Sequence, residues 1–255
     1  MLDMNAQRSA SGIFYAVLSS ATFGLIPLFS IPLLGVGIGS STILFYRFAL
    51  AATFMAMVML VGGYSFVIRR EVVGRVLLLS VLYAATAILL LESYKYIPSG
   101  VATTIHFLYP LAVTLTMSWL FGEKSSVVTY IAVGVSLVGV ALLAWGTHSS
   151  NYFGRGVTLA LMTVVTYAAY MVGVMRSRAA RIDSLVLTFY VLVIGAVMFM
   201  IYALTTTGIE AIHRWSSWRN LLMLAVICTV LSDFTLILAI KNIGSTMTSI
   251  LGSME

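Results

Sequence analysis

Charged side chains are scarce in this sequence. Only 9% of its 255 residues are Asp, Glu, Lys or Arg, whereas 61% are hydrophobic, and the mean hydropathy is +1.06. A typical soluble domain carries about 25% charged residues. This composition excludes an ordinary water-soluble surface.

The chain also has too little cysteine for a disulfide framework, since Cys228 is its single cysteine and lies within an apolar block. The net charge of +6 comes from 14 Lys and Arg residues that are spread over short connections. Nucleic-acid binding proteins instead gather such residues on one face. We therefore expect no nucleic-acid partner.

Enzyme motifs are absent as well. The sequence contains no His-Glu-x-x-His pair, no Gly-x-Ser-x-Gly elbow and no glycine-rich nucleotide loop. A retinal-type receptor would need a lysine in the middle of a helix, whereas Lys95 and Lys241 fall at predicted helix ends. These absences predict a protein that is not an enzyme, with no catalytic residue, metal ion or cofactor.

What the sequence does contain is a series of apolar blocks of about 20 residues, the length of helix that crosses ~30 Å of hydrocarbon. Because lipid tolerates no unpaired backbone groups, each block is expected to be a helix. The prediction is an all-α integral membrane protein. Its eight complete spans are 12–33, 40–61, 72–94, 99–121, 126–145, 156–175, 184–204 and 221–240, and part of a ninth begins near Ser245.

The distribution of basic residues predicts the orientation in the membrane. With the N-terminus inside, nine Lys and Arg residues fall on the inner side and four on the outer side, while Arg47 lies within a span. Cytoplasmic loops carry the excess of Lys and Arg. We therefore predict a multi-pass protein of the cell (plasma or inner) membrane with a cytoplasmic N-terminus.

The sequence repeats itself at half its length. A shift of 144 residues carries Phe45-Tyr46 onto Phe189-Tyr190, and a shift of 146 carries Lys95-Tyr96-Ile97 onto Lys241-Asn242-Ile243. A half with five spans is odd in number, so the second copy must enter the membrane in the opposite orientation, as in alternating-access carriers. On this register the ninth helix continues past Glu255 and a tenth follows, so the sequence is expected to be truncated.

Three short motifs stand out in the first half: Phe-Tyr-Arg-Phe at 45–48, Ala-Thr-Thr-Ile-His-Phe-Leu-Tyr-Pro at 102–110 and Phe-Gly-Glu-Lys at 121–124. Together they resemble the EamA branch of the drug/metabolite transporter superfamily. The resemblance implies an inverted 5+5 repeat of transmembrane helices. Its first EamA repeat would be 12–145 (helices 1–5), and its second, truncated, 156–255 (helices 6–8 and the start of 9). It also implies a central cavity lined by helices 1, 3, 4, 6, 8 and 9.

This resemblance implies a secondary-active transporter, exporting amino acids or similar small metabolites or drugs by alternating access. The partners would be a small organic metabolite as substrate, the lipid bilayer, and a proton as the candidate coupling ion. Two alternatives stay open: a flippase of lipid-linked sugar on the same fold, and a non-transporting membrane scaffold or receptor.

Polar groups that share helix faces within the spans are the candidates for substrate binding, because a polar face in lipid must meet a cavity or another helix. Helix packing is the alternative for Phe23, Tyr167 and Tyr170, and a packing role is the alternative for His106. The candidates are Phe23, Tyr83, Thr86, Thr103, His106, Tyr109, Tyr167, Tyr170 and Ser232.

Ionisable groups inside spans are costly and form a second set. Asp233 and Glu255 are candidates for proton coupling, and Arg47 for a structural or substrate-binding role; each could instead form a structural ion pair. Glu92 lies three residues before Lys95 near the membrane boundary, which predicts an interfacial ion pair.

Overall fold

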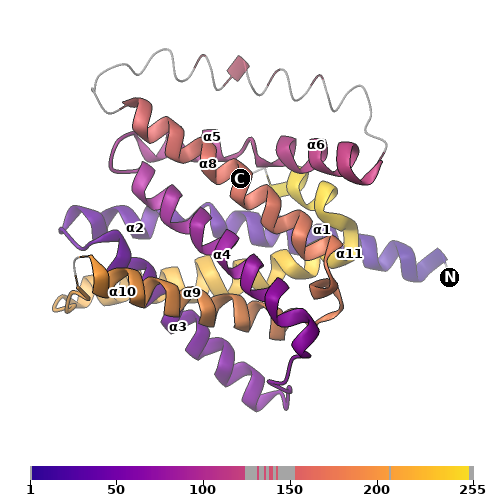
Figure 1. Cartoon of the computed structure of the whole chain (residues 1–255), viewed down its shortest axis with the longest axis horizontal. Coiled ribbons are helices and arrows are strands. Elements are labelled where there is room, and N and C mark those ends of the chain that lie inside the picture. The colour runs from indigo at the N-terminus through magenta and orange to yellow at the C-terminus, as the bar shows by residue number, and fades with distance from the viewer. Residues whose placement is uncertain are drawn as a thin grey trace.

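The computed structural model describes residues 2–123, 153–206 and 208–252, with isolated positions between 131 and 142, and describes side chains from residue 9 onward. Within these residues every regular element is a helix (Figure 1). Seven helical segments are long and apolar enough to cross a membrane. The predicted all-α membrane protein is therefore confirmed, whereas the helix count and the 5+5 repeat stay predictions. The predicted span 126–145 and Glu255 lie outside the described residues.

The first two spans begin the bundle. The first is divided into α1 (Leu2–Phe23) and α2 (Ile26–Gly35), and α2 has a proline at its first turn and Pro32 inside. Proline supplies no backbone N–H, so it fits a helix start but weakens a helix interior. The second span is α3 (Ser40–Val61), whose bounds are those predicted.

The next two spans follow the same logic. The third is α4 (Arg70–Ser93), and the fourth is divided into α5 (Ser99–His106) and α6 (Tyr109–Phe121). Pro110 lies in the first turn of α6, where its missing N–H costs nothing. The chain therefore breaks beside His106, which leaves that side chain at a helix end.

The second part of the chain contains α8 (Phe153–Arg176), the short 3₁₀ helix η1 (Arg178–Arg181) and α9 (Ser184–Thr205), which Asp183 caps. The last span begins with α10 (Trp215–Ala225), six residues before the predicted start at Leu221, because Trp218 and the polar residues around it form a first helical turn rather than a loop. A π-helical turn, η2 (Val226–Leu231), joins α10 to α11 (Ser232–Gly252). Within α11 the backbone leaves helical geometry at Gly244, with φ 83° and ψ 163°.

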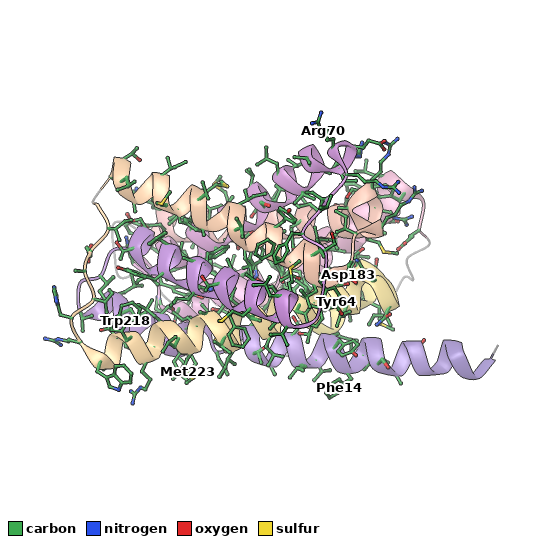
Figure 2. All side chains as sticks on the ribbon, turned by 90° about the horizontal axis from the view of Figure 1, so that it is seen from below. Phe14, Tyr64, Arg70, Asp183, Trp218 and Met223 are labelled. Carbon is green, nitrogen blue, oxygen red and sulfur yellow. The ribbon has the colours of Figure 1, made fainter. Side chains whose placement is uncertain are left out.

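Long helices from distant parts of the sequence pack in pairs. α1 lies along α11, α3 along α9, and α4 along α8 (Figure 1). Exposed apolar side chains, such as Phe14 and Met223, project from the outer face of the bundle (Figure 2), where a bilayer would solvate them. Arg70 and Trp218 mark opposite ends of the bundle in the same view.

Candidate functional site

Arg47 lies in the interior of α3 and is only 5% exposed. Its Nε donates to Thr229 Oγ1 at 2.6 Å and its Nη2 to the Cys228 carbonyl at 3.4 Å. Thr229 in turn donates to the Leu224 carbonyl, five residues back, at 2.7 Å. The π-helical turn thus presents a hydroxyl and a carbonyl to the guanidinium, and such turns are frequent at functional sites.

Asp233 follows this turn at the start of α11 and is 3% exposed. Its Oδ1 accepts a hydrogen bond from the Tyr83 hydroxyl of α4. Its Oδ2 is buried and has no hydrogen-bond partner among the described residues. Arg47 interacts with it electrostatically but forms no direct ion pair with it in the described structure. A buried carboxylate oxygen that lacks a partner is costly and therefore marks a place for a proton or a ligand.

A row of aromatic rings connects Asp233 with His106. Tyr83 lies 5.1 Å from Tyr170, Tyr170 lies 6.1 Å from Tyr167, and Tyr167 lies 5.1 Å from His106, measured between ring centroids. The side chains come from α4, α8 and α5. The structure therefore brings together predicted site residues that are up to 150 positions apart in sequence.

His106 ends this row in a fully buried position. Its Nδ1 lies 2.8 Å from Thr163 Oγ1, and the Thr163 hydroxyl donates to the Ala160 carbonyl at 2.5 Å. Since a hydroxyl has one proton, the hydrogen bond with His106 requires Nδ1–H as donor. The other nitrogen, Nε2, is then an acceptor, and it has no partner among the described residues.

The remaining candidates have more local roles. Phe23 stacks on Tyr167 at 5.9 Å, and Tyr109 meets the same ring edge-on at 4.7 Å. Thr86 shares a hydrogen bond of 2.7 Å with Thr166 of α8, and Thr103 donates to the Ser99 carbonyl within its own helix.

Ser232 contacts a neighbouring helix rather than the aromatic row. The Ser232 hydroxyl donates to the Ser19 carbonyl at 3.0 Å, and the Ser19 hydroxyl donates to the Ser232 carbonyl at 2.9 Å. Ser232 thereby joins α11 to α1.

An interior cavity begins beside Arg47 and Tyr83 and measures ≈ 20 Å³, which holds about one water molecule. It extends toward Tyr94, which lies between the end of α4 and Lys95. The lining comes from α1, α2, α3, α4 and α10, so α3, outside the cavity helices that the resemblance implied, contributes to it. The lining residues are Phe23, Ile26, Ser30, Ile43, Leu44, Arg47, Tyr83, Thr86, Ala87, Leu90, Leu91, Tyr94 and Leu224.

A larger hollow of ≈ 530 Å³ lies elsewhere, between the loop before α4 and the segment from η1 to the start of α9. Tyr64 and Asp183, both labelled in Figure 2, line it. Its wall carries an exposed ion pair, Glu71 with Arg178 at 3.6 Å. The buried polar groups described above do not line this hollow.

A family model described as "EamA-like transporter family" matches residues 10–145 and 154–255. The chain belongs to this family. The EamA chain is 31% identical over 93 residues to the uncharacterized transporter sll1319 of Synechocystis sp., a match that covers 35% of this chain and 28% of that protein. It is 30% identical over 124 residues to the uncharacterized transporter YvbV of Bacillus subtilis, covering 48% and 40% respectively.

The matched segments thus span less than half the length of either relative. A solved structure described as "Crystal structure of protein" superimposes with a TM-score of 0.67 and 17% identity, covering 97% of the EamA chain and 86% of the solved chain. At this identity the likeness concerns the fold alone.

Sequence reasoning missed two features of the site. Ser30 lines the cavity with a buried hydroxyl that has no described partner, and its position in an apolar run is a signal that could have identified it. Thr229 holds Arg47 only because the helix widens to a π-turn there, and no sequence pattern indicates that turn.

Proposed function

We propose that this EamA chain forms the translocation path of a secondary-active transporter that exports amino acids or similar small metabolites by alternating access. The two halves, 12–145 and 156–255, act in this proposal as inverted repeats around a common site. Asp233 is the group that takes up and releases the coupling proton, and the cell membrane is the site of action.

The observation that carries the proposal is the surroundings of Asp233. A carboxylate in the interior of a membrane bundle costs ~3 kcal/mol or more on insertion scales, and this cost persists only where function or pairing offsets it. Tyr83 stabilises one oxygen, whereas the other has no described partner. Tyr170, Tyr83 and Arg47 are the titratable groups that act on it.

The chemistry of the interior supports a small amphipathic cargo. Aromatic rings from Tyr83 to His106 offer apolar faces with hydroxyl groups at their edges, and Arg47 suits a carboxylate. The ≈ 20 Å³ cavity is too small for such a cargo. The helices must therefore separate during transport, as alternating access requires.

The test is transport by the full-length protein in proteoliposomes, with a panel of amino acids, other metabolites and drugs, each with and without a pH gradient. We expect net flux of at least one amphipathic metabolite, and a dependence of that flux on the gradient. Movement of lipid-linked sugar in place of soluble cargo would select the flippase alternative. No flux of any cargo, from protein shown to be folded and inserted, would contradict the proposal.

A further inference from the structure

Contacts between polar groups join neighbouring helices at one end of the bundle. Lys241 of α11 donates through Nζ to the Ile182 carbonyl, just before α9. At the same end Glu123 accepts from Arg176 at 2.7 Å and from Thr246 at 3.1 Å. These contacts join α11 to the start of α9 and to the end of α8. We call the end that contains them the Lys241 end, and the opposite one the Lys95 end.

The repeat register gives the Lys241 contact a counterpart. The shift of 146 carries Lys95 onto Lys241, and the shift of 144 carries Ile38 onto Ile182. Ile38 and Ile182 both lie two residues before the start of a long helix, α3 or α9. The first turns of these helices match, since Ile43 bonds back to Gly39 at 3.0 Å and Leu187 to Asp183 at 2.9 Å.

Helix packing next to the two lysines follows the same register. A Cβ atom at Gly12 would lie 2.5 Å from Ile243 Cγ2, and one at Gly156 would lie 2.7 Å from Ile97 Cγ2. The shift of 144 carries Gly12 onto Gly156, and the shift of 146 carries Ile97 onto Ile243, so the two contacts are equivalent in the repeat. Each lysine is thus two residues from an isoleucine that packs on an equivalent glycine, so the surroundings of Lys95 and Lys241 are related in space as well as in sequence.

The two lysines nevertheless differ in their partners. Lys95 does not bond to Ile38 in the described structure but pairs with Glu92, at the end of α4, at 2.7 Å, with side chains 40% and 25% exposed. Lys241 has Leu238 at the position that matches Glu92. Lys95 therefore has an acid three residues before it that holds it in an ion pair, and Lys241 has no acid at the matching position.

We infer that Lys95 and Lys241 are reciprocal gate residues: Lys241 closes its end on the Ile182 carbonyl in this conformation, and Lys95 closes the other end on the Ile38 carbonyl in the alternate one. In this conformation Glu92 holds Lys95 away from that carbonyl. The inference rests on the proposed alternating access. It adds to that proposal which groups form and break contacts when the ends exchange.

The test uses two reporter cysteines in a Cys228→Ala background of the full-length protein. Ser30→Cys lies in the cavity toward the Lys95 end, and the same shift of 144 places Val174→Cys, now fully buried, toward the Lys241 end. A membrane-impermeant maleimide measures the labelling rate of each. Thermal unfolding and size-exclusion profiles check that every variant is folded.

Lys241→Met should raise the ratio of Val174→Cys to Ser30→Cys labelling, and Lys95→Met should lower it. Glu92→Gln frees Lys95, so it should raise the ratio by about two- to fivefold, the range that a partly exposed ion pair can supply. That rise should vanish when Lys95→Met is also present, since Glu92 acts through Lys95 alone. Glu71→Gln, which removes an exposed acid that pairs with Arg178 and with neither lysine, should leave the ratio unchanged.

Three results would overturn the inference. The labelling ratio could shift in the same direction for Lys95→Met and Lys241→Met, or the effect of Glu92→Gln could persist when Lys95→Met is also present. The third is no change of the ratio in any variant. Cargo flux is measured separately on the same preparations. Reciprocal labelling without flux would keep the gate and contradict the proposed cargo. Cargo flux together with a labelling ratio that does not change in the Lys95 and Glu92 variants would support the proposed transporter and contradict the gate.

Discussion

Asp233 combines burial, a hydroxyl partner on one oxygen and no described partner on the other. Replacement by asparagine keeps an acceptor for Tyr83 but removes the charge and the ability to take up a proton. We expect Asp233→Asn to fold and insert, and to lower proton-driven flux by at least about tenfold, equivalent to 1.36 kcal/mol in the transport barrier. Flux at several pH values in proteoliposomes is the measurement.

The matched control is Glu71→Gln, which removes a carboxylate that is 73% exposed in the first turn of α4. Its flux and pH profile should equal those of the unmodified protein. If Asp233→Asn transports at an unchanged rate with an unchanged pH profile, Asp233 has a structural role and the proposed coupling is wrong.

Arg47 illustrates how a buried charge depends on a neighbour's local geometry. Thr229→Val keeps the shape of the side chain but removes the oxygen that accepts from Arg47 Nε at 2.6 Å. Leaving a buried donor unpaired costs about 1–3 kcal/mol, and more when it is charged. We therefore expect a lower midpoint of thermal unfolding in detergent.

A double variant distinguishes this loss of pairing from simple loss of packing. Arg47→Met with Thr229→Val removes donor and acceptor together, and such replacements are often neutral. It should unfold at a higher temperature than Thr229→Val alone. A double variant that is less stable than both single variants would show that the π-turn, and not the hydrogen bond, determines the stability.

Among the elements, two contacts depend on close approach: α1 against α11, and α8 against the connection between α4 and α5. Gly12 and Gly156 leave no room for a Cβ atom, as the distances to Ile243 and Ile97 show. Overpacking costs about 1–3 kcal/mol. Gly12→Ala and Gly156→Ala should each lower the thermal unfolding midpoint, whereas Gly154→Ala, where a Cβ atom meets nothing within 4 Å, should not.

Relief of the collision provides the decisive comparison for these glycines. Ile243→Ala removes the atom that a Cβ at position 12 would meet. Added to Gly12→Ala, it should restore part of the lost stability, although by itself it leaves a cavity and destabilises. A purely additive loss would argue against close packing as the cause.

The helices themselves were largely predictable, because the apolar length of a span depends on bilayer thickness and local sequence. The span 40–61 agrees residue for residue with α3, and 99–121 has the bounds of α5 and α6 together. The division at α1 and α2 and the π-turn η2 were not predicted. Both depend on how neighbouring helices satisfy the freed backbone groups, which a local pattern does not contain.

The sequence indicated which candidate residues to consider, but it could not indicate their partners. Costly polar groups within spans identified Asp233, His106 and Arg47. That Tyr83 pairs with Asp233, and that Thr229 rather than a carboxylate holds Arg47, depends on contacts over 150 and 182 positions of sequence. Such contacts follow from the tertiary arrangement, so residue spacing within one helix cannot give them.

At the scale of the whole molecule, the orientation in the membrane follows from the ends of the bundle. Arg70 and Trp218 lie at opposite ends (Figure 2), and the basic residues are concentrated at the end that contains Arg70. The positive-inside rule predicts that this end faces the cytoplasm. In the Cys228→Ala background, we expect Arg70→Cys to react with a membrane-impermeant maleimide only from the inner side of oriented vesicles, and Arg214→Cys only from the outer side. Both positions are exposed, so burial cannot explain a failure to react. The opposite result would invert the molecule in the membrane. The Lys241 end would then face outward.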